Sequence, residues 1–228
     1  MSTARCGEVP RRGQAAARSL EGSVKQREDA VAASGVVTQG REVLRVVDAI
    51  RILEGSCALT AEDDLAVRAW LGDRYTWLAT SEAGKGAGRA KDHIGTWYVV
   101  QAHALATHLD ARADIYRMCV HAKRLIAVQI GGDGRQPLEI ARADGLSSSI
   151  LNLEGHMHLA LLASQARVDL WNHVPENGRG LKDAVDYLRP FNATPEGWPH
   201  KQSAEVAPGS LDRVLALAKL LDSMLATE

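Results

Sequence analysis

The chain has 228 residues, of which 46% are hydrophobic and only 4% aromatic, and its 27 Lys and Arg nearly balance 28 Asp and Glu. This length fits one globular domain or one and a half, and the shortage of aromatic rings favours a helical core of Ala, Leu, Val and Ile over an all-β sandwich. The formal net charge of −1 offers no general basic surface, so no nucleic acid is expected as a partner. The sequence contains no run of about 18 apolar residues, so no membrane span is predicted.

Residues 1–35 are rich in Ala, Gly, Ser and Arg and contain few large apolar side chains, so we expect a disordered or loosely docked arm. Residues 36–228 are expected to form the folded domain. The arm lacks the apolar core of a secretory signal. Three widely spaced cysteines, Cys6, Cys57 and Cys119, include no Cys-x-x-Cys pair, which argues against a disulfide framework and a thiolate zinc site.

From Val43 onward, apolar residues recur at the spacing of an amphipathic helix. Helices are predicted over residues 40–54, 61–81, 94–108, 111–130, about 150–164, 181–188 and 211–225. The glycines within Ala83–Gly88 are interpreted as a flexible connection, and Pro137 as confirmation that the fourth helix has ended. Seven helices without a convincing strand indicate antiparallel helical hairpins, stacked as a bundle or a toroid.

Aromatic and hydrogen-bonding side chains concentrate at residues 77–81 and 92–101. Such a mixture suits sugars, because flat rings pack on the apolar faces of pyranoses while Asp, His and Gln bind hydroxyl groups. The alternative is that Trp77 and Trp97 are core residues in a protein that is otherwise short of aromatic side chains.

A second polar segment covers residues 129–142 and continues to Asn152. The planar guanidinium of Arg142 is suited to hold a substrate carboxylate with two hydrogen bonds. An ordinary ion pair with Glu139 or Asp144 explains the same residues equally well.

The histidine spacings do not indicate a metal site. His103 and His108 are five residues apart, and His156 and His158 are two apart, so neither pair shares a helical face. No metal or other cofactor is therefore predicted. The run Ser147–Ser149 lacks the strained Gly-x-Ser-x-Gly turn of a hydrolase nucleophile.

Five sequence blocks, taken in order, resemble the alginate lyase superfamily of helical-toroid polysaccharide lyases over roughly residues 36–200. The blocks are Val46–Glu54, Trp77–Ser81, Gly95–Gln101, Ala127–Ile130 with Asp133–Glu139, and Val168–Trp171. The resemblance implies an all-α fold, an incomplete (α/α) toroid of antiparallel helical hairpins around a cleft for an acidic polysaccharide such as alginate.

The chemistry implied by the resemblance is β-elimination at a uronic acid, in which the C5 proton is removed and the C4 glycosidic bond breaks. That proton is a very weak acid beside a carboxylate. An Asn and an Arg therefore neutralise the carboxylate, a His or Tyr takes the proton, and a Tyr protonates the leaving oxygen.

The family's Asn-Asn-His motif stands immediately before its Gly-x-Trp-Tyr. A gapless alignment places Asp92, His93 and Ile94 there, which puts Ile94 at the catalytic His position. A slip of one residue restores His93 to that role but puts the anionic Asp92 where the family has a neutralising Asn.

Arg142 matches the Arg of the family's Glu-Leu-Ala-Arg block, whereas the catalytic Tyr expected six or seven residues later falls on Ser148 or Ser149. The predicted catalytic residues are His93 as the base and Arg142 on the uronate carboxylate. The residues predicted to contact or support the sugar are Asp92, Trp97, Tyr98, Gln101, Gln136 and Asn152.

The expected function is therefore a lyase with degenerate catalytic motifs and weak or no activity. The alternative is a non-catalytic helical carbohydrate-binding or scaffold protein. Family members carry further helices and an export signal before the block that starts here near Val36, so the amino-terminal part is expected to be missing. Exposed helix faces would then favour low stability or oligomerisation. The family suggests a periplasmic or secreted protein, against which the Arg-rich opening argues.

Overall fold

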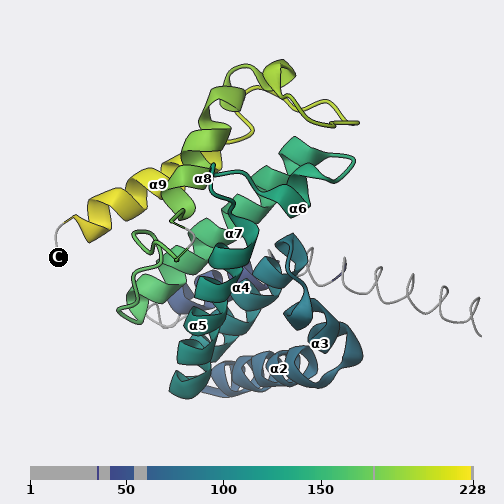
Figure 1. Ribbon diagram of the computed structural model, residues 1–228. Helices are drawn as coiled ribbons and strands as arrows, with labels where there is room; N and C mark the ends of the chain where they lie inside the picture. Colours follow the sequence, from purple (N-terminus) through teal and green to yellow (C-terminus); the bar gives the residue numbers. More distant parts are fainter. Residues whose placement is uncertain (1–34, 36–41, 54–60, 177, 227–228) are drawn as a thin grey trace, which may run out of the picture.

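The computed structural model describes residue 35 and residues 42–53, 61–176 and 178–226 (Figure 1). The arm expected over residues 1–35 lies, except for Gly35, outside the described residues. None of the described helices is long and apolar enough to cross a membrane.

Residues 42–53 are helical, and the helices that follow are short to medium in length. They are α2 (Ala61–Thr80), α3 (Glu82–Arg89), α4 (His93–His108), α5 (Arg112–Gln129), α6 (Pro137–Ile140), α7 (Gly145–Gln165), α8 (Leu181–Leu188) and α9 (Asp212–Leu225), with 3-10 turns η1 (Arg189–Asn192) and η2 (Pro195–Gly197). Among the described residues the only β-type pairing is an isolated bridge between Asp144 and Gln202. The predicted all-α architecture is confirmed.

The prediction of a flexible glycine-rich connection before α4 is wrong, because these residues form α3. Ser81 caps the helix with extended backbone, and its side chain accepts a hydrogen bond from the Gly84 backbone N–H at 3.0 Å. A Cβ atom at Gly84 would lie 2.0 Å from the carbonyl oxygen of Leu78. The glycine therefore allows α3 to fold back closely on the end of α2.

α4 is the central helix, and it packs against α2 and α3 on one side and against α5 and α7 on the other. Figure 1 shows α2 and α3 at one end of the molecule and α8 and α9 at the other. Gly155 of α7 makes the close approach to α4 possible, because a Cβ there would lie 2.8 Å from the Thr96 side chain. Most of α4 is consequently buried, and its position in the molecule is fixed.

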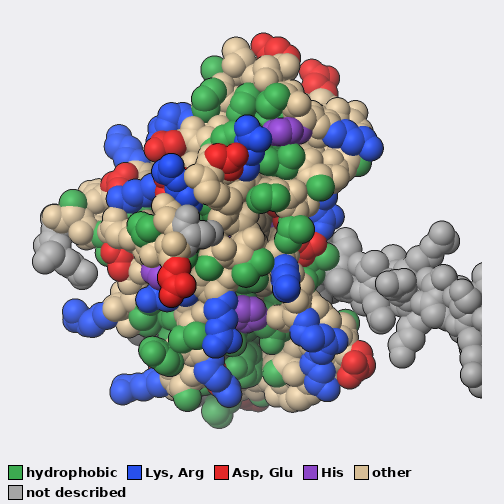
Figure 2. Space-filling model, viewed as in Figure 1, with side chains coloured by type: hydrophobic (Ala, Val, Ile, Leu, Met, Phe, Trp, Pro, Cys, Tyr) green, Lys and Arg blue, Asp and Glu red, His purple; other side chains and the backbone are tan. Residues whose placement is uncertain are grey.

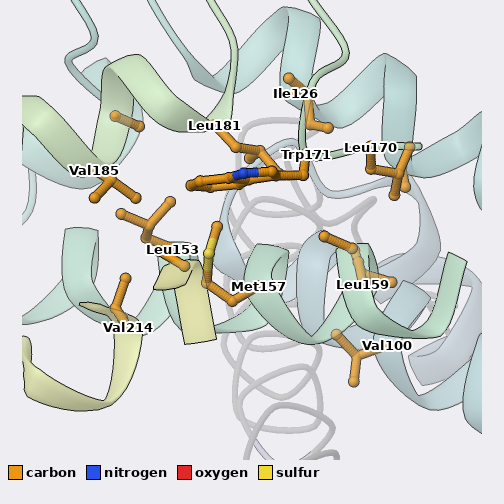
Figure 3. Packing of buried hydrophobic residues seen from close by; sticks show 14 of the residues in the cluster. Val100, Ile126, Leu153, Met157, Leu159, Leu170, Trp171, Leu181, Val185 and Val214 are labelled. Atoms are coloured by element: carbon orange, nitrogen blue, oxygen red, sulfur yellow. The ribbon is translucent and has the colours of Figure 1, made fainter. Parts of the chain in front are cut away.

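The larger hydrophobic cluster joins α4, α5 and α7 to α8 and α9. In it the Trp171 ring lies beside Leu153, Met157 and Leu181 (Figure 3). A smaller cluster joins the helix over residues 42–53 to α2 and α4. Both clusters contain residues of α4, so the amino-terminal end of this helix is held on two sides.

Candidate active site

Asp92 and His93 begin α4 and occupy the positive end of its dipole. Asp92 has extended backbone, with φ −114° and ψ −167°, and its Oδ1 accepts a hydrogen bond from the Ile94 backbone N–H at 3.1 Å. Aspartate is among the preferred residues for this capping position, because its carboxylate both accepts the free N–H and complements the dipole. The cap therefore fixes where the next side chain, that of His93, starts.

Glu139 on the short helix α6 reaches the same point from 46 residues further along the chain. Its Oε1 accepts the His93 backbone N–H at 2.7 Å, and its Oε2 lies 2.8 Å from His93 Nδ1. The side chain is 1% exposed, so these partners compensate the cost of burying a carboxylate. A carboxylate only accepts hydrogen bonds, so Nδ1 carries a proton, and in the neutral imidazole the lone pair is on Nε2.

Arg142 follows one turn after Glu139 and completes the cluster. Its Nε lies 3.1 Å from Glu139 Oε2, and its terminal nitrogen contacts the Asp92 carboxylate. The Arg142 side chain is 37% exposed and the Asp92 side chain 21% exposed. We call Asp92, His93, Glu139 and Arg142 the Arg142 cluster.

A shallow depression of about 380 Å³ opens beside two members of this cluster, Asp92 and Arg142. Its walls include Lys91, Asp92, Leu138 and Arg142. In this cluster the carboxylates of Asp92 and Glu139 both contact the single guanidinium of Arg142. A carboxylate ligand at Arg142 must therefore compete with Asp92 for the same cation.

The structure brings His93 and Arg142 together, since both contact Oε2 of Glu139. Asp92, the third residue predicted there, is part of the same cluster. The ion pair of Arg142 with Glu139, considered as an alternative to a substrate-binding role, is present as well. The ion pair with Glu139 and a substrate-binding role are therefore not mutually exclusive for Arg142.

The two predicted tryptophans have different surroundings. Trp97 is 0% exposed, and its Nε1 donates to the Leu151 carbonyl at 3.1 Å, so it cannot stack on a sugar and is a core residue that supports α4. Trp77 lies near the surface, with the Arg74 guanidinium 4.5 Å from its ring centre. Tyr98 is half-buried beside Gly88, 6.4 Å from the His121 ring, and burial raises the pKa of its phenol.

Three predicted sugar contacts, those of Gln101, Gln136 and Asn152, are wrong as direct contacts because these side chains are buried. Gln101 accepts a hydrogen bond from Arg74 at 2.9 Å. Asn152 Nδ2 donates to Gln136 Oε1 at 2.7 Å and to Gln129 Oε1 at 2.9 Å. They belong instead to interior hydrogen-bond networks.

The network around Gln129 supports the cluster from the interior. Gln129 Nε2 donates to the Asp92 carbonyl at 3.1 Å, and its Oε1 lies 2.6 Å from His156 Nε2. Burial lowers the pKa of His156 to about 3, so its ring is neutral. We call Thr96, Gln129, Gln136, Asn152 and His156 the buried amide network.

The serines at the expected Tyr position do not replace a phenol. Ser149 is buried, and its Oγ donates to the Gly145 carbonyl at 2.7 Å. Among the described residues, no tyrosine hydrogen-bonds to any member of the Arg142 cluster. A proton donor to the leaving oxygen is not built into this cluster.

Glu139, Lys91, Gln129 and His156 contribute to the site or its support but are not among the residues predicted from the sequence. The spacing of Glu139 and Arg142 by one helical turn was the available signal. The contact between Glu139 and His93 joins positions 46 residues apart, and no local pattern reveals it.

The described residues form an all-α fold, and His93 and Arg142 meet at Glu139 beside an open depression. The chain matches the alginate lyase family model over residues 15–198, and it belongs to the alginate lyase family. The match begins within the segment that was expected to be a separate arm.

A solved alginate lyase structure from Bacteroides ovatus is similar, with a TM-score of 0.73 and 28% sequence identity. The alignment covers 80% of this chain and 49% of that chain. This chain thus spans about half the length of that lyase. No curated protein shows significant similarity to it.

Proposed function

We propose that this protein is a polysaccharide lyase of the alginate lyase type, which binds a uronic-acid polymer over the Arg142 cluster and cleaves it slowly by β-elimination. The observation that carries the proposal is the shared contact of His93 and Arg142 with Glu139. It holds a base and a carboxylate-binding cation at one point, as elimination beside a uronate requires.

In this mechanism Arg142 holds the uronate carboxylate and stabilises the charge that develops when C5 loses its proton. Nε2 of His93 takes that proton while Glu139 stabilises the imidazolium that forms. The C5–H electron pair becomes the C4=C5 double bond, and the C4–O bond breaks with its electrons on the leaving oxygen. Water protonates that oxygen.

Low activity follows from two features of the cluster. Asp92 already pairs with one of the two terminal nitrogens of Arg142, so a uronate carboxylate must compete with it. Protonation of the leaving oxygen by water instead of a positioned acid would cost roughly 10²- to 10⁴-fold in rate.

The test is the ultraviolet absorbance of the unsaturated product during incubation with polymannuronate or polyguluronate. We expect a slow rise that is lost in Arg142→Ala and His93→Gln but retained in Lys219→Ala, which removes an exposed cation of α9. Equal rates in all four proteins would contradict the assignment.

The contact of Asp92 with Arg142 also favours a second candidate, a carbohydrate-binding protein without catalysis. In that case calorimetric titration with the same polymers would show saturable binding that depends on Arg142, with no rise in absorbance. A protein that neither binds nor cleaves uronates would instead fit a structural scaffold.

A further inference from the structure

A second groove runs between α3 and α5, on the side of α4 where Tyr98 and His121 lie. It has a volume of about 600 Å³, and residues 88–91 and one face of α5 line it. Figure 2 shows Lys and Arg side chains over both α3 and α5, with a histidine between them. The basic residues that line the groove are Arg89, Lys91, Arg117 and Arg124.

None of the described residues that line this groove carries a carboxylate. Within the described parts of the chain, Arg117 pairs with Asp114, whereas Arg89, Lys91 and Arg124 form no ion pair. Unpaired cations that share a groove repel one another, and an anionic ligand relieves that repulsion. The local field also acts on His121, whose pKa is lowered by burial and further by the positive charge of Arg124.

The groove is continuous with the depression at Arg142, because Ala90 and Lys91 line both. Its walls also carry apolar surface. The Tyr116 side chain is 65% exposed and Val128 is 52% exposed. A ligand that fits both parts is a chain with repeated negative charges and apolar ring faces.

We propose that the α3–α5 groove is an extended binding site for an acidic glycan, in which Arg89, Lys91 and Arg124 bind the carboxylates of sugar units beyond the one held at Arg142. This inference rests on the proposed function, since the glycan is the one that enters the Arg142 depression. Affinity then depends on the number of sugar units in the glycan as well as on the presence of a uronate carboxylate.

A glycan fits these observations better than a nucleic acid. The chain has a net charge of −1, and the groove offers four basic residues instead of the broad basic surface that binds phosphates regardless of sequence.

The experiment is a calorimetric titration of the full chain with an oligomannuronate dimer and with the octamer. The wild-type protein should bind the octamer more tightly. In Arg89→Ala/Arg124→Ala we expect octamer affinity to fall about tenfold and to depend less steeply on salt, with dimer affinity unchanged, because each exposed cation contributes modestly. Lys219→Ala is the matched control, and circular dichroism melts verify that each variant is folded.

Further outcomes separate this inference from the proposed function. If Arg142→Ala weakens both ligands and the groove variant binds the octamer like wild type, the groove proposal is overturned while the function stands. If the groove variant loses octamer binding but Arg142→Ala binds both ligands normally, the groove stands and the function fails. Single-stranded DNA of equal charge that bound as tightly as the octamer would overturn the assignment to a glycan.

Discussion

The Arg142 cluster and the α3–α5 groove adjoin each other, but they use positive charge in opposite ways. Arg142 faces two carboxylates, whereas Arg89, Lys91 and Arg124 form no ion pair among the described residues. Paired charges are held in fixed positions, which orients His93 but reduces the attraction for a ligand. Unpaired surface cations attract a polyanion without fixing its orientation. The comparison indicates that binding of the polymer and positioning for chemistry are divided between two neighbouring regions.

Replacement of Glu139 is expected to have the largest effect on the Arg142 cluster and little effect on the groove. In Glu139→Ala, Arg142 and the His93 backbone N–H lose their buried partner, so the free energy of unfolding should fall by about 3 to 5 kcal/mol. Octamer binding in the groove should persist in the folded fraction, because no groove cation contacts Glu139. Urea denaturation measures the first effect and titration at low temperature the second.

The matched control is Glu82→Ala, which removes an exposed glutamate that also pairs three residues away, with Lys85. Its unfolding free energy should stay within about 0.5 kcal/mol of the wild-type value. Comparable losses in the two variants would mean that the buried position of Glu139 has no special energetic role.

Acid should destabilise the fold through two buried histidines and leave the Lys and Arg residues of the groove charged. Burial lowers the pKa of His156 to about 3 and of His103 to about 4, from an ordinary value of 6.5. Between the pKa of each histidine in the folded chain and its ordinary pKa of 6.5, the unfolded chain binds a proton that the folded chain does not. The contribution of each neutral histidine to stability is therefore full above about pH 6.5 and is lost as the pH falls. At pH 4.5 the cost is about 2 to 3 kcal/mol for each histidine.

The variant that isolates this effect is His156→Gln, whose amide can still donate to Gln129. Its unfolding free energy, followed by urea denaturation from pH 7.5 to pH 4.5, should fall less steeply than that of the wild type. The Lys and Arg residues of the groove stay charged throughout this range, so polyanion binding should persist while the protein is folded. An unchanged slope in His156→Gln would show that His156 does not contribute to acid sensitivity.

The fold was largely predictable because helical periodicity is a local property. The bounds predicted for α5 and α8 agree closely with the structure, whereas two short helices near the site were missed. Gly84 of α3 packs against the backbone of Leu78, and Pro137 occupies the first turn of α6, where its missing N–H costs nothing. Both residue types were interpreted as breaks because their packing partners are not visible in the sequence.

The site was predictable only in part, since its decisive contacts are long-range. Asp92, His93 and Arg142 were predicted as neighbours from the family resemblance, and the structure places them in one cluster. The burial of Gln136 and Asn152 could not be foreseen, because Asn and Gln side chains are mostly exposed. The hydrogen bond between them compensates part of the free-energy cost of burying two polar side chains.

Asp92→Asn is the smallest of these changes, because it removes one charge and little else. It tests directly whether Asp92 competes with a ligand for Arg142. Asparagine caps a helix as well as aspartate, so stability should change by less than about 1 kcal/mol. Arg142 loses one of its two carboxylates, and affinity for the uronate dimer should rise about tenfold, equivalent to about 1.4 kcal/mol. The product absorbance should rise faster at low substrate concentration.

Asp114→Asn is the corresponding change in the groove, where Asp114 pairs with Arg117. It should strengthen octamer binding and leave dimer binding unchanged, since Arg117 lines the groove but not the depression. If Asp92→Asn binds the dimer no better than wild type, competition by Asp92 does not limit ligand binding at Arg142. Slow cleavage would then be attributed to the second feature alone, the absence of a positioned acid at the leaving oxygen, and an added small-molecule acid should restore more activity than any charge change.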